Sequence, residues 1–277
     1  MTAVFQPLKA SPSVATEALL QVSGVSRRYV SNRQDTTALQ DVTMSIQEGE
    51  FVCVVGPSGC GKSTLLNLIS GLDRPTTGSL TFDGRAIEKA GPDRIVVFQE
   101  PALYPWMNVR GNVEFGLKMK GVTKQQRHDA VERYLDLVHL TGFERAYVHE
   151  LSGGMKQRVQ LARCLAVEPR MLLMDEPFAA LDAQTRDALQ MELQEIWART
   201  GATIFFITHN VREAALLADR VLVMTPGPGQ FKTKIAIDLP RPRAPESHAV
   251  VDYASEIRAA LQDETYAGRS MEGRFAI

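Results

Sequence analysis

The stretch from Gly56 to Ser63 reads Gly-Pro-Ser-Gly-Cys-Gly-Lys-Ser, which fits the pattern G-x-x-x-x-G-K-[ST] of a phosphate-cradling loop. Its glycines let the backbone curl so that main-chain N–H groups point at phosphate oxygens. The Lys62 ammonium supplies a positive charge for the β- and γ-phosphates, and the Ser63 hydroxyl is a ligand for Mg²⁺. The stretch therefore predicts a binding site for a nucleoside triphosphate.

The residues around this loop supply the context that the motif needs. Residues 51–55 are apolar and β-prone, and residues 64–69 are compatible with a helix, whose positive end would start near Lys62. The alternative is a glycine-rich turn that happens to precede a lysine. The residues expected to contact the nucleotide are Gly56, Pro57, Ser58, Gly59, Cys60, Gly61, Lys62, Ser63 and Thr64. Because Cys60 lies inside the loop, we hypothesise that its alkylation blocks nucleotide binding and that ATP protects it.

Two adjacent carboxylates follow an apolar run. Residues 171–174 read Met-Leu-Leu-Met, a β-prone stretch, and Asp175 and Glu176 come next. Adjacent carboxylates repel each other in apolar surroundings, so the pair needs a cation such as Mg²⁺. Asp175 would coordinate Mg²⁺ indirectly, and Glu176 would polarise the attacking water. The alternative is a pair of acids that end a strand and face solvent.

Gln99 and His209 also stand where strands are expected to end. Gln99 follows residues 94–98, and its amide oxygen could bind Mg²⁺ or water. His209 follows residues 203–208 and could hydrogen-bond a γ-phosphate oxygen. A lone Gln or His is most often structural. Ligands of open α/β sheets bind at the carboxyl ends of strands, which favours the functional reading for both.

A second candidate anion site lies at Ser152, Gly153 and Gly154. Ser152 is a plausible N-cap for the helix that the following residues predict. A helix start with two glycines offers main-chain N–H groups to an anion. Two such helix starts in one chain suggest that two chains share each nucleotide. A plain capped helix is the alternative, and the spacing alone does not exclude it.

The elements that must position these residues alternate along the chain. The strands are expected at residues 19–22, 42–46, 51–55, 79–82, 94–98, 171–174, 203–208, 220–224 and 235–239. Helices are expected at 183–200, 211–219 and 254–261, and helical periodicity dominates 108–168. Residues 31–37 read as a polar hairpin insertion, and Pro226-Gly227-Pro228-Gly229 breaks the alternation. The pattern predicts a largely parallel sheet flanked by helices, interrupted by a helical lobe.

Size and composition limit the classes of protein to consider. The chain has 277 residues, 44% of them hydrophobic, and a net charge of −1. This charge gives no support to a nucleic-acid binder held by a basic field. No apolar run approaches the length that spans a bilayer, and the N-terminus does not read as a signal peptide. The three cysteines are scattered and lack metal-ligand spacing.

The motifs occur together in a recognisable order. They are the phosphate loop, Gln99, Ser152-Gly153-Gly154, Asp175-Glu176, Ala180-Leu181-Asp182 and His209. In this order and spacing, residues 19–225 resemble the ATP-binding subunit of an ABC transporter. The resemblance implies a P-loop NTPase (RecA-like) α/β core with an antiparallel β subdomain and an inserted helical lobe at about residues 100–168. Residues 226–277 would then be a C-terminal extension. Residues 1–18 are rich in Ala, Ser, Thr and Pro, a composition that predicts a mobile tail.

The same resemblance implies an ATPase that uses ATP and Mg²⁺. Its metal ligands would be Ser63, Gln99 and Asp175, and its catalytic residues Gln99, Glu176 and His209. Two copies would form a head-to-tail dimer in which the Ser152-Gly153-Gly154 segment of one completes the site of the other. Tyr29 would stack on adenine, with simple edge packing as its alternative.

Further motifs resemble those of importers for nitrate, sulfonates and taurine. They are residues 91–94, 96–106, 175–178 and 225–229, and the departures from the family pattern are Met155, Ala179 and Asn210. This resemblance implies membrane permease subunits as partners and an extracytoplasmic solute-binding protein as an indirect one. It places the chain at the cytoplasmic face of the membrane, peripherally, with no nucleic-acid partner. Tyr104 and Trp106 would anchor a permease helix in a groove, unless both are core residues of the helical lobe.

Two other functions compete with transport. One is an ABC-type ATPase that acts on DNA or ribosomes, although such proteins usually carry long coiled coils or two cassettes in one chain. The other is a regulatory module that does not turn over ATP, which the intact Glu176 and His209 argue against. The resemblance to nitrate, sulfonate and taurine importers favours a small oxyanion or sulfonate as the transported solute, and the permease and the binding protein would decide which one.

Overall fold

The computed structural model describes residues 18–30 and 35–272, with side chains described only as far as residue 262. Most of the predicted N-terminal tail, and residues 31–34 of the predicted hairpin insertion, lie outside the described residues. The chain divides into two compact units, and the boundary falls at residues 90/91 and 203/204. We call residues 91–203 the helical unit and the other described residues the phosphate-loop unit.

The phosphate-loop unit contains an antiparallel sheet with the order β2-β1-β4-β5. Its strands are β1 (Leu20–Tyr29), β2 (Thr36–Ile46), β4 (Thr77–Phe82) and β5 (Arg85–Ala86). Leu20 pairs with Ile46 of β2 on one side and with Phe82 of β4 on the other. All three side chains are buried, so one apolar face holds the sheet against the core. This is the predicted antiparallel β subdomain.

A second set of strands in this unit carries the phosphate loop. It consists of β3 (Phe51–Val55), β8 (Thr203–Ile207), β9 (Arg220–Met224) and β10 (Phe231–Ala236). β3 pairs in parallel with both β8 and β9, while β10 runs antiparallel to β9. All five residues of β3 are buried, as expected for a central strand that is covered on both faces.

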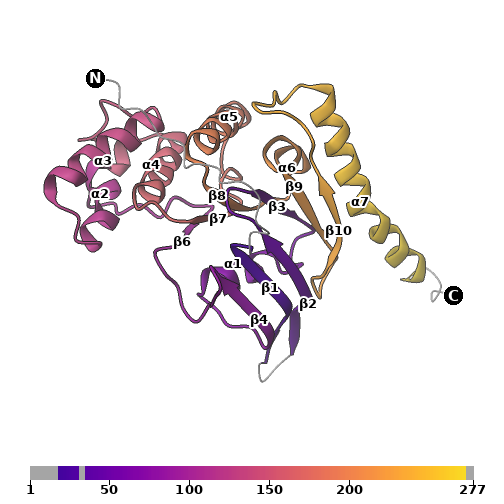
Figure 1. The fold of residues 1–277 in the computed structure, drawn as a ribbon. Coiled ribbons are helices and arrows are strands. Elements are labelled where there is room, and N and C mark those ends of the chain that lie inside the picture. The colour runs from indigo at the N-terminus through magenta and orange to yellow at the C-terminus, as the bar shows by residue number, and fades with distance from the viewer. Residues whose placement is uncertain (1–17, 31–34, 273–277) are drawn as a thin grey trace, which may run out of the picture. The chain divides into compact units, whose positions relative to one another are not determined.

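Three helices complete the phosphate-loop unit as far as it is described. They are α1 (Lys62–Ser70), α6 (Val211–Leu217) and α7 (His248–Glu272). Figure 1 shows α7, in yellow, running beside α6 and the edge of β9 and β10. The C-terminal elements differ from the prediction. β10 starts at Phe231 because its residues pair with β9 directly after the turn, and α7 is much longer than residues 254–261.

The helical unit contains two parallel strands, β6 (Arg94–Val97) and β7 (Met171–Asp175). Its helices are α2 (Val109–Met119), α3 (Lys124–Leu137), α4 (Gly153–Ala166) and α5 (Ala183–Thr200), with a 3₁₀ turn η1 (Val148–Glu150). Each α-helix starts at a side-chain N-cap: Asn108, Thr123, Ser152 and Asp182. Figure 1 shows α2, α3 and α4 packed together, which confirms the helical lobe.

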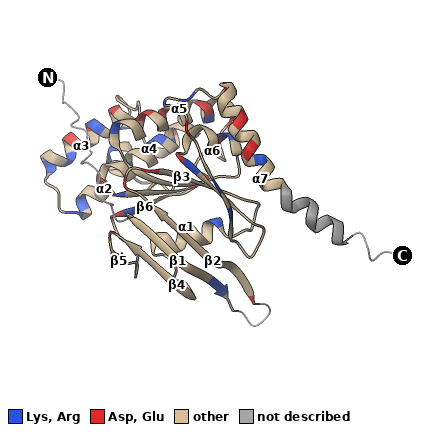
Figure 2. Cartoon of the chain, turned by 45° about the vertical axis from the view of Figure 1, so that its right-hand side comes forward, with Lys and Arg blue, Asp and Glu red and all other residues tan. Residues whose placement is uncertain are grey.

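The surface carries charges of both signs. Figure 2 shows Lys and Arg interspersed with Asp and Glu along α3, α5 and α7. In the part of the chain that the structure describes, no helix is both long enough and apolar enough to cross a bilayer.

Candidate functional site

The phosphate loop joins β3 to α1, as the motif predicts. Gly59 and Gly61 adopt φ values of 75° and 99°, a left-handed conformation that other residues rarely take. Gly61 is the N-cap of α1, and a Cβ there would lie 2.6 Å from the carbonyl oxygen of Ala38. An added Cβ at Gly59 would meet no atom within 4 Å, so the loop is open at that residue. Its curled, glycine-rich backbone fits a phosphate group.

Lys62 is the charged residue of this loop. Only 7% of the residue is exposed, and its Nζ donates to the carbonyl oxygens of Gly56 and Pro57, both at 2.9 Å. Pro57, Ser58, Gly59 and Ser63 are exposed, and Thr64 is half-buried. The ammonium is thus held inside the loop, while the neighbouring residues face outward. This arrangement suits the binding of an anion over the start of α1.

Cys60 is buried beneath the loop, with its Sγ 3.9 Å from the Lys62 Nζ. Burial raises the pKa of the Cys60 thiol, and the nearby Lys62 charge opposes that rise only in part. The side chain also sits against Gly56, where an added Cβ would lie 2.7 Å from the sulfur. Alkylation in the native state is therefore expected to be slow, because the reactive thiolate is both rare and covered.

A segment far along the sequence packs against the same loop. In the turn between β9 and β10, an added Cβ at Gly229 would lie 2.0 Å from the carbonyl oxygen of Cys60. Gly229 also donates to the carbonyl of Ala38 at 2.9 Å and accepts from the N–H of Gln40 at 3.0 Å. The turn thus connects β2 to the phosphate loop, and only glycine fits there.

Tyr29 lies at the end of β1, and Asp73 fixes its hydroxyl. The Tyr29 hydroxyl donates to Asp73 Oδ2 at 2.9 Å, and Arg27 pairs with the same carboxylate at 3.0 and 2.9 Å. The Arg27 guanidinium lies 4.5 Å from the centroid of the Tyr29 ring. Tyr29 is still 40% exposed, so ring surface remains for a base to stack on. Adenine stacking stays a prediction.

His209 follows β8, whose Ile207 pairs with Val54 of β3. His209 and the phosphate loop therefore leave their strands at the same edge of the sheet. The preceding Thr208 donates to Glu213 Oε2 at 2.5 Å and accepts from the Asn210 N–H at 3.0 Å. The structure thus fixes the backbone on both sides of His209, whose side chain is exposed.

Asn210, which follows His209, departs from the family pattern. The structure shows what this residue does beside His209. Its Oδ1 accepts from the Arg212 N–H at 3.0 Å and caps the start of α6. Asn is among the preferred N-cap residues, together with Asp and Ser. The substitution therefore keeps the helix start intact.

In the helical unit, Gln99 and the two carboxylates also share one edge. Val97 of β6 pairs with Met174 of β7, so the residues that follow these strands leave at the same end. β6 ends at Val97, two residues before the exposed Gln99. Asp175 ends β7, and both acids are half-buried.

Glu176 has an unusual backbone. Its φ is 45°, in the left-handed region that costs a non-glycine residue about 1–3 kcal/mol. Its carbonyl accepts from the Ala179 N–H at 3.1 Å, which turns the chain away from β7. Strain of this kind persists only where the surroundings hold it. The carboxylate is therefore presented by a fixed bend rather than by a flexible strand end.

The segment Ser152-Gly153-Gly154 forms the start of α4. The Ser152 Oγ accepts from the Met155 N–H at 3.3 Å, so this is a capped helix. Ser152 and Gly153 are exposed, and an added Cβ at Gly154 would lie 2.6 Å from Thr185 Cγ2. The helix start is thus accessible to a ligand held elsewhere, as a shared site would require.

The structure arranges the predicted residues in two sets. The phosphate-loop unit holds Tyr29, Gly56 to Thr64 and His209, and the helical unit holds Gln99, Ser152 to Gly154, Asp175 and Glu176. Among the described residues, no group of three or more His, Cys, Asp or Glu side chains could hold a metal ion. The predicted Mg²⁺ ligands Ser63, Gln99 and Asp175 include one carboxylate. This set suits an ion that takes further oxygens from phosphate and water.

Trp106 is not a core residue, because 70% of it is exposed. The core alternative is therefore wrong for Trp106. Tyr104 is half-buried, with its ring centroid 4.7 Å from that of Phe115 and 5.5 Å from that of Trp106. The Arg163 guanidinium lies 5.5 Å from the Tyr104 centroid. Tyr104 thus supports an exposed Trp106, and the role of both as anchors stays a prediction.

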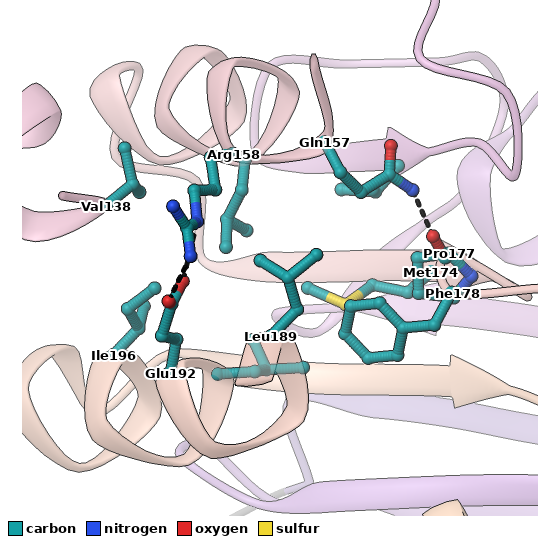
Figure 3. Close-up of a pocket in the computed structure, with 12 residues that line it drawn as sticks. Val138, Gln157, Arg158, Met174, Pro177, Phe178, Leu189, Glu192 and Ile196 are labelled. Atoms are coloured by element: carbon teal, nitrogen blue, oxygen red, sulfur yellow. Dashed lines mark hydrogen bonds and ion pairs between the residues drawn. The ribbon is translucent and has the colours of Figure 1, made fainter. Parts of the chain in front are cut away.

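The pocket in Figure 3 is a packing gap in the helical unit, between α4 and α5. Its volume of about 20 Å³ has room for about one water molecule, so it cannot take a nucleotide. The Arg158–Glu192 pair, at 3.0 Å between Nε and Oε2, closes one side.

Sequence reasoning missed several residues that support the site. They are Arg27, Asp73, Gln157, Gln160 and Glu213. The sequence analysis named Gly229 as part of a turn but did not predict its contact with the phosphate loop. A signal existed for the glutamines, because two amides three residues apart on an otherwise apolar helix face require partners. No signal pointed to Asp73 or Glu213, whose partners are fixed only by the folded chain.

Comparisons with known proteins agree with this geometry. The family model described as ABC transporter matches residues 39–179. The nitrate import ATP-binding protein NrtD of Synechocystis sp. is 50% identical, over 80% of this chain and 83% of its own length. The taurine import ATP-binding protein TauB of Burkholderia pseudomallei is also 50% identical, over 81% and 86%.

A solved structure shows the same fold. The dimeric ATP-binding cassette MJ0796, in a post-hydrolysis state bound to ADP and Pi, superposes with a TM-score of 0.70. It is 30% identical and covers 79% of this chain and 99% of its own. Together with the phosphate loop and the strand-end residues, these likenesses show that the chain belongs to the ABC transporter family, as an ATP-binding subunit.

Proposed function

We propose that the chain is the ATP-hydrolysing subunit of an importer for a small solute such as nitrate, a sulfonate or taurine. One observation carries this proposal. Over about four fifths of its length, the chain is 50% identical to ATP-binding proteins named for nitrate and taurine import. The exposed phosphate loop and the intact Glu176 and His209 support turnover of ATP. In this proposal residues 19–225 carry the catalytic and nucleotide-binding residues, and residues 226–277 are a C-terminal extension.

Each residue set has a separate task in this proposal. Residues 56–64 hold the triphosphate through main-chain N–H groups and the Lys62 ammonium, and Tyr29 stacks on the adenine. The ligands of Mg²⁺ are Ser63, Gln99 and Asp175. When bound, the ion offsets the negative charge that develops on the phosphates.

Glu176 polarises the attacking water through its carboxylate, which its left-handed backbone presents. Gln99 orients that water, and His209 hydrogen-bonds a γ-phosphate oxygen. Both roles use side chains that the structure leaves exposed at strand ends.

The active form is a head-to-tail dimer of this chain. The exposed start of α4 at Ser152, Gly153 and Gly154 would complete the ATP site of a second copy. The dimeric state of the solved MJ0796 cassette supports this assembly. ATP would close the pair and hydrolysis would reopen it.

The remaining partners lie in the membrane. The dimer works at the cytoplasmic face beneath two permease subunits, which receive solute from an extracytoplasmic binding protein. Trp106, supported by Tyr104, is a candidate anchor for a permease helix. A Trp106→Ala variant should assemble poorly with the permease or hydrolyse ATP without transport. Normal assembly and transport would remove Trp106 from this role.

The substitution Glu176→Gln tests the assignment directly. It removes the carboxylate but keeps side-chain size, so hydrolysis should fall by at least about 100-fold, the range for a lost general base. ATP binding should persist, and the variant should form an ATP-bound dimer on size exclusion. Glu195→Gln, on the exposed face of α5, is the matched control. Unchanged turnover in Glu176→Gln would remove Glu176 from catalysis.

A non-transport ABC-type ATPase is the competing function. It would also hydrolyse ATP, so the test must identify the partner. Purification of the chain from membranes should yield permease subunits. Recovery with ribosomes or DNA instead would favour the competitor.

A further inference from the structure

Two buried glutamines lie on one face of α4. Gln157 and Gln160 are three residues apart, and 5% and 0% of these residues are exposed. Residues three apart on a helix are neighbours on its surface. Buried side-chain amides are costly unless they are hydrogen-bonded, so their partners show what the helix holds.

Gln157 holds the residue that follows Glu176. Its Nε2 donates to the carbonyl oxygen of Pro177, as the dashed line in Figure 3 shows. Glu176 is the residue with the left-handed backbone, which requires external support. The Gln157 amide binds the next carbonyl along the chain and so supplies part of that support.

Gln160 holds the residue that precedes Gln99. Its Nε2 donates to the carbonyl oxygen of Phe98 at 3.2 Å. Phe98 and Gln99 lie beyond the last residue of β6, so the strand ladder does not fix them. The amide of Gln160 therefore ties the chain to α4 directly beside Gln99.

Stability alone does not account for these glutamines. The Oε1 atom of each is buried and has no partner among the described residues. An unsatisfied buried acceptor is destabilising, and an apolar side chain of similar length would avoid it. The two amides thus hold specific backbone carbonyls at a cost in stability, which is typical of residues that position a functional site.

We propose that Gln157 and Gln160 are positioning residues that align Glu176 and Gln99 with the start of α4. One helix then sets both the catalytic side chains of its own copy and the Ser152-Gly153-Gly154 segment that completes the neighbouring copy's site. This inference rests on the proposed function. It adds that α4 links its own N-terminal segment to the backbone beside Glu176 and Gln99. A shift of the helix start would therefore displace both residues together.

The variants Gln157→Met and Gln160→Met test the proposal in the full-length chain. Methionine keeps the length of the side chain and removes both the donor and the unpartnered acceptor. For each variant, kcat for Mg-ATP hydrolysis should fall by about two- to tenfold, the range of one hydrogen bond. KM for ATP should stay within about twofold. Tm should change little, because each variant loses the donor to one carbonyl but also removes an unpartnered buried oxygen.

Hydrogen exchange gives a readout that does not depend on activity. Exchange should rise in the peptide covering 171–182 for Gln157→Met and in that covering 94–104 for Gln160→Met. The control is Gln194→Met, which changes a buried glutamine of α5 that contacts Met191 of its own helix. Exchange in these two peptides should be unchanged in the control.

The outcomes separate this inference from the proposed function. A wild-type chain that does not hydrolyse ATP contradicts the proposed function. A wild-type ATPase whose two variants keep both kcat and exchange contradicts the positioning role. A fall in Tm that accounts for the lost activity, or failure of both variants to fold, assigns the glutamines to structure and also overturns the inference. The two variants are tested separately. If one of them does not fold, the other still tests the positioning role.

Discussion

Neighbouring side chains already hold Tyr29, the residue proposed to stack on adenine. Its hydroxyl is bound to Asp73, and Asp73 is in turn paired with Arg27. The phenol can therefore offer a base its ring but not a free hydroxyl. A ring that is fixed before the ligand arrives loses little side-chain entropy on binding.

The ring and the hydroxyl of Tyr29 can be tested separately. Tyr29→Ala removes stacking worth about 1–3 kcal/mol, so ATP affinity should fall by about 5- to 150-fold. Tyr29→Phe keeps the ring and should lose less than about tenfold, the value of one hydrogen bond. Equilibrium titration with a fluorescent ATP analogue measures both. Arg28→Gln on the same strand is the control, and unchanged affinity in Tyr29→Ala would contradict the stacking role.

The thiol of Cys60 predicts a pH-dependent reactivity. Burial raises its pKa, so near neutral pH the thiol is protonated in the folded chain, and the thiolate appears only as pH rises through that raised value. Iodoacetamide should label Cys60 slowly at pH 7.5 and faster above pH 9, as peptide mass spectrometry would show. Unfolded chain should react faster at every pH. Mg-ATP should slow native labelling, and fast labelling that ATP leaves unchanged would contradict both burial and protection.

At the scale of elements, the residues after β10 hold the end of α6. Arg243 is buried, and its guanidinium donates to the carbonyls of Ala215 at 3.0 Å and Ala218 at 2.7 Å. It also reaches the carbonyl of Leu239 at 3.1 Å. Burial lowers the pKa of Arg243 to about 10, which leaves it charged at neutral pH. A cation at a helix C-terminus is favourable, and α6 begins directly after His209 and Asn210.

Arg243→Met should destabilise the chain by about 3 kcal/mol, because the helix-end carbonyls lose a charged donor and stay buried. A lower urea midpoint at unchanged slope measures the effect. Arg243→Lys should recover part of the loss, since one ammonium replaces a guanidinium that reaches several carbonyls. Arg258→Met, at an exposed position of α7, is the control. A midpoint shift no larger than that of the control would contradict the role of Arg243.

At the scale of the whole chain, the extension is part of the phosphate-loop unit. β10 covers the edge of β9, Arg243 holds α6, and Gly229 contacts the phosphate loop. A chain that stops after Thr225 should therefore fail to fold, whereas one that stops after Gln262 should fold and bind ATP. Soluble yield, circular dichroism and nucleotide titration compare the two. A folded, ATP-binding 1–225 fragment would show that the extension is dispensable.

Local patterns predicted most of the fold and the candidate site. The predicted helix at 183–200 and the strand at 220–224 match the structure because periodicity and caps act within a few residues. β10 was misplaced because its position depends on pairing with β9, which no local pattern shows. The supports of Tyr29 and His209 were missed for the same reason, since Asp73 and Glu213 meet them only in the folded chain.

The contact between Gly229 and Cys60 limits how relatives of this chain can be recombined. Only a hydrogen atom fits between the α-carbon of residue 229 and the carbonyl of Cys60. A hybrid gene that joins the first 224 codons of one transporter to the tail of another thus brings together two surfaces that touch. Such a hybrid should keep nucleotide affinity only if the donated tail carries glycine at that position.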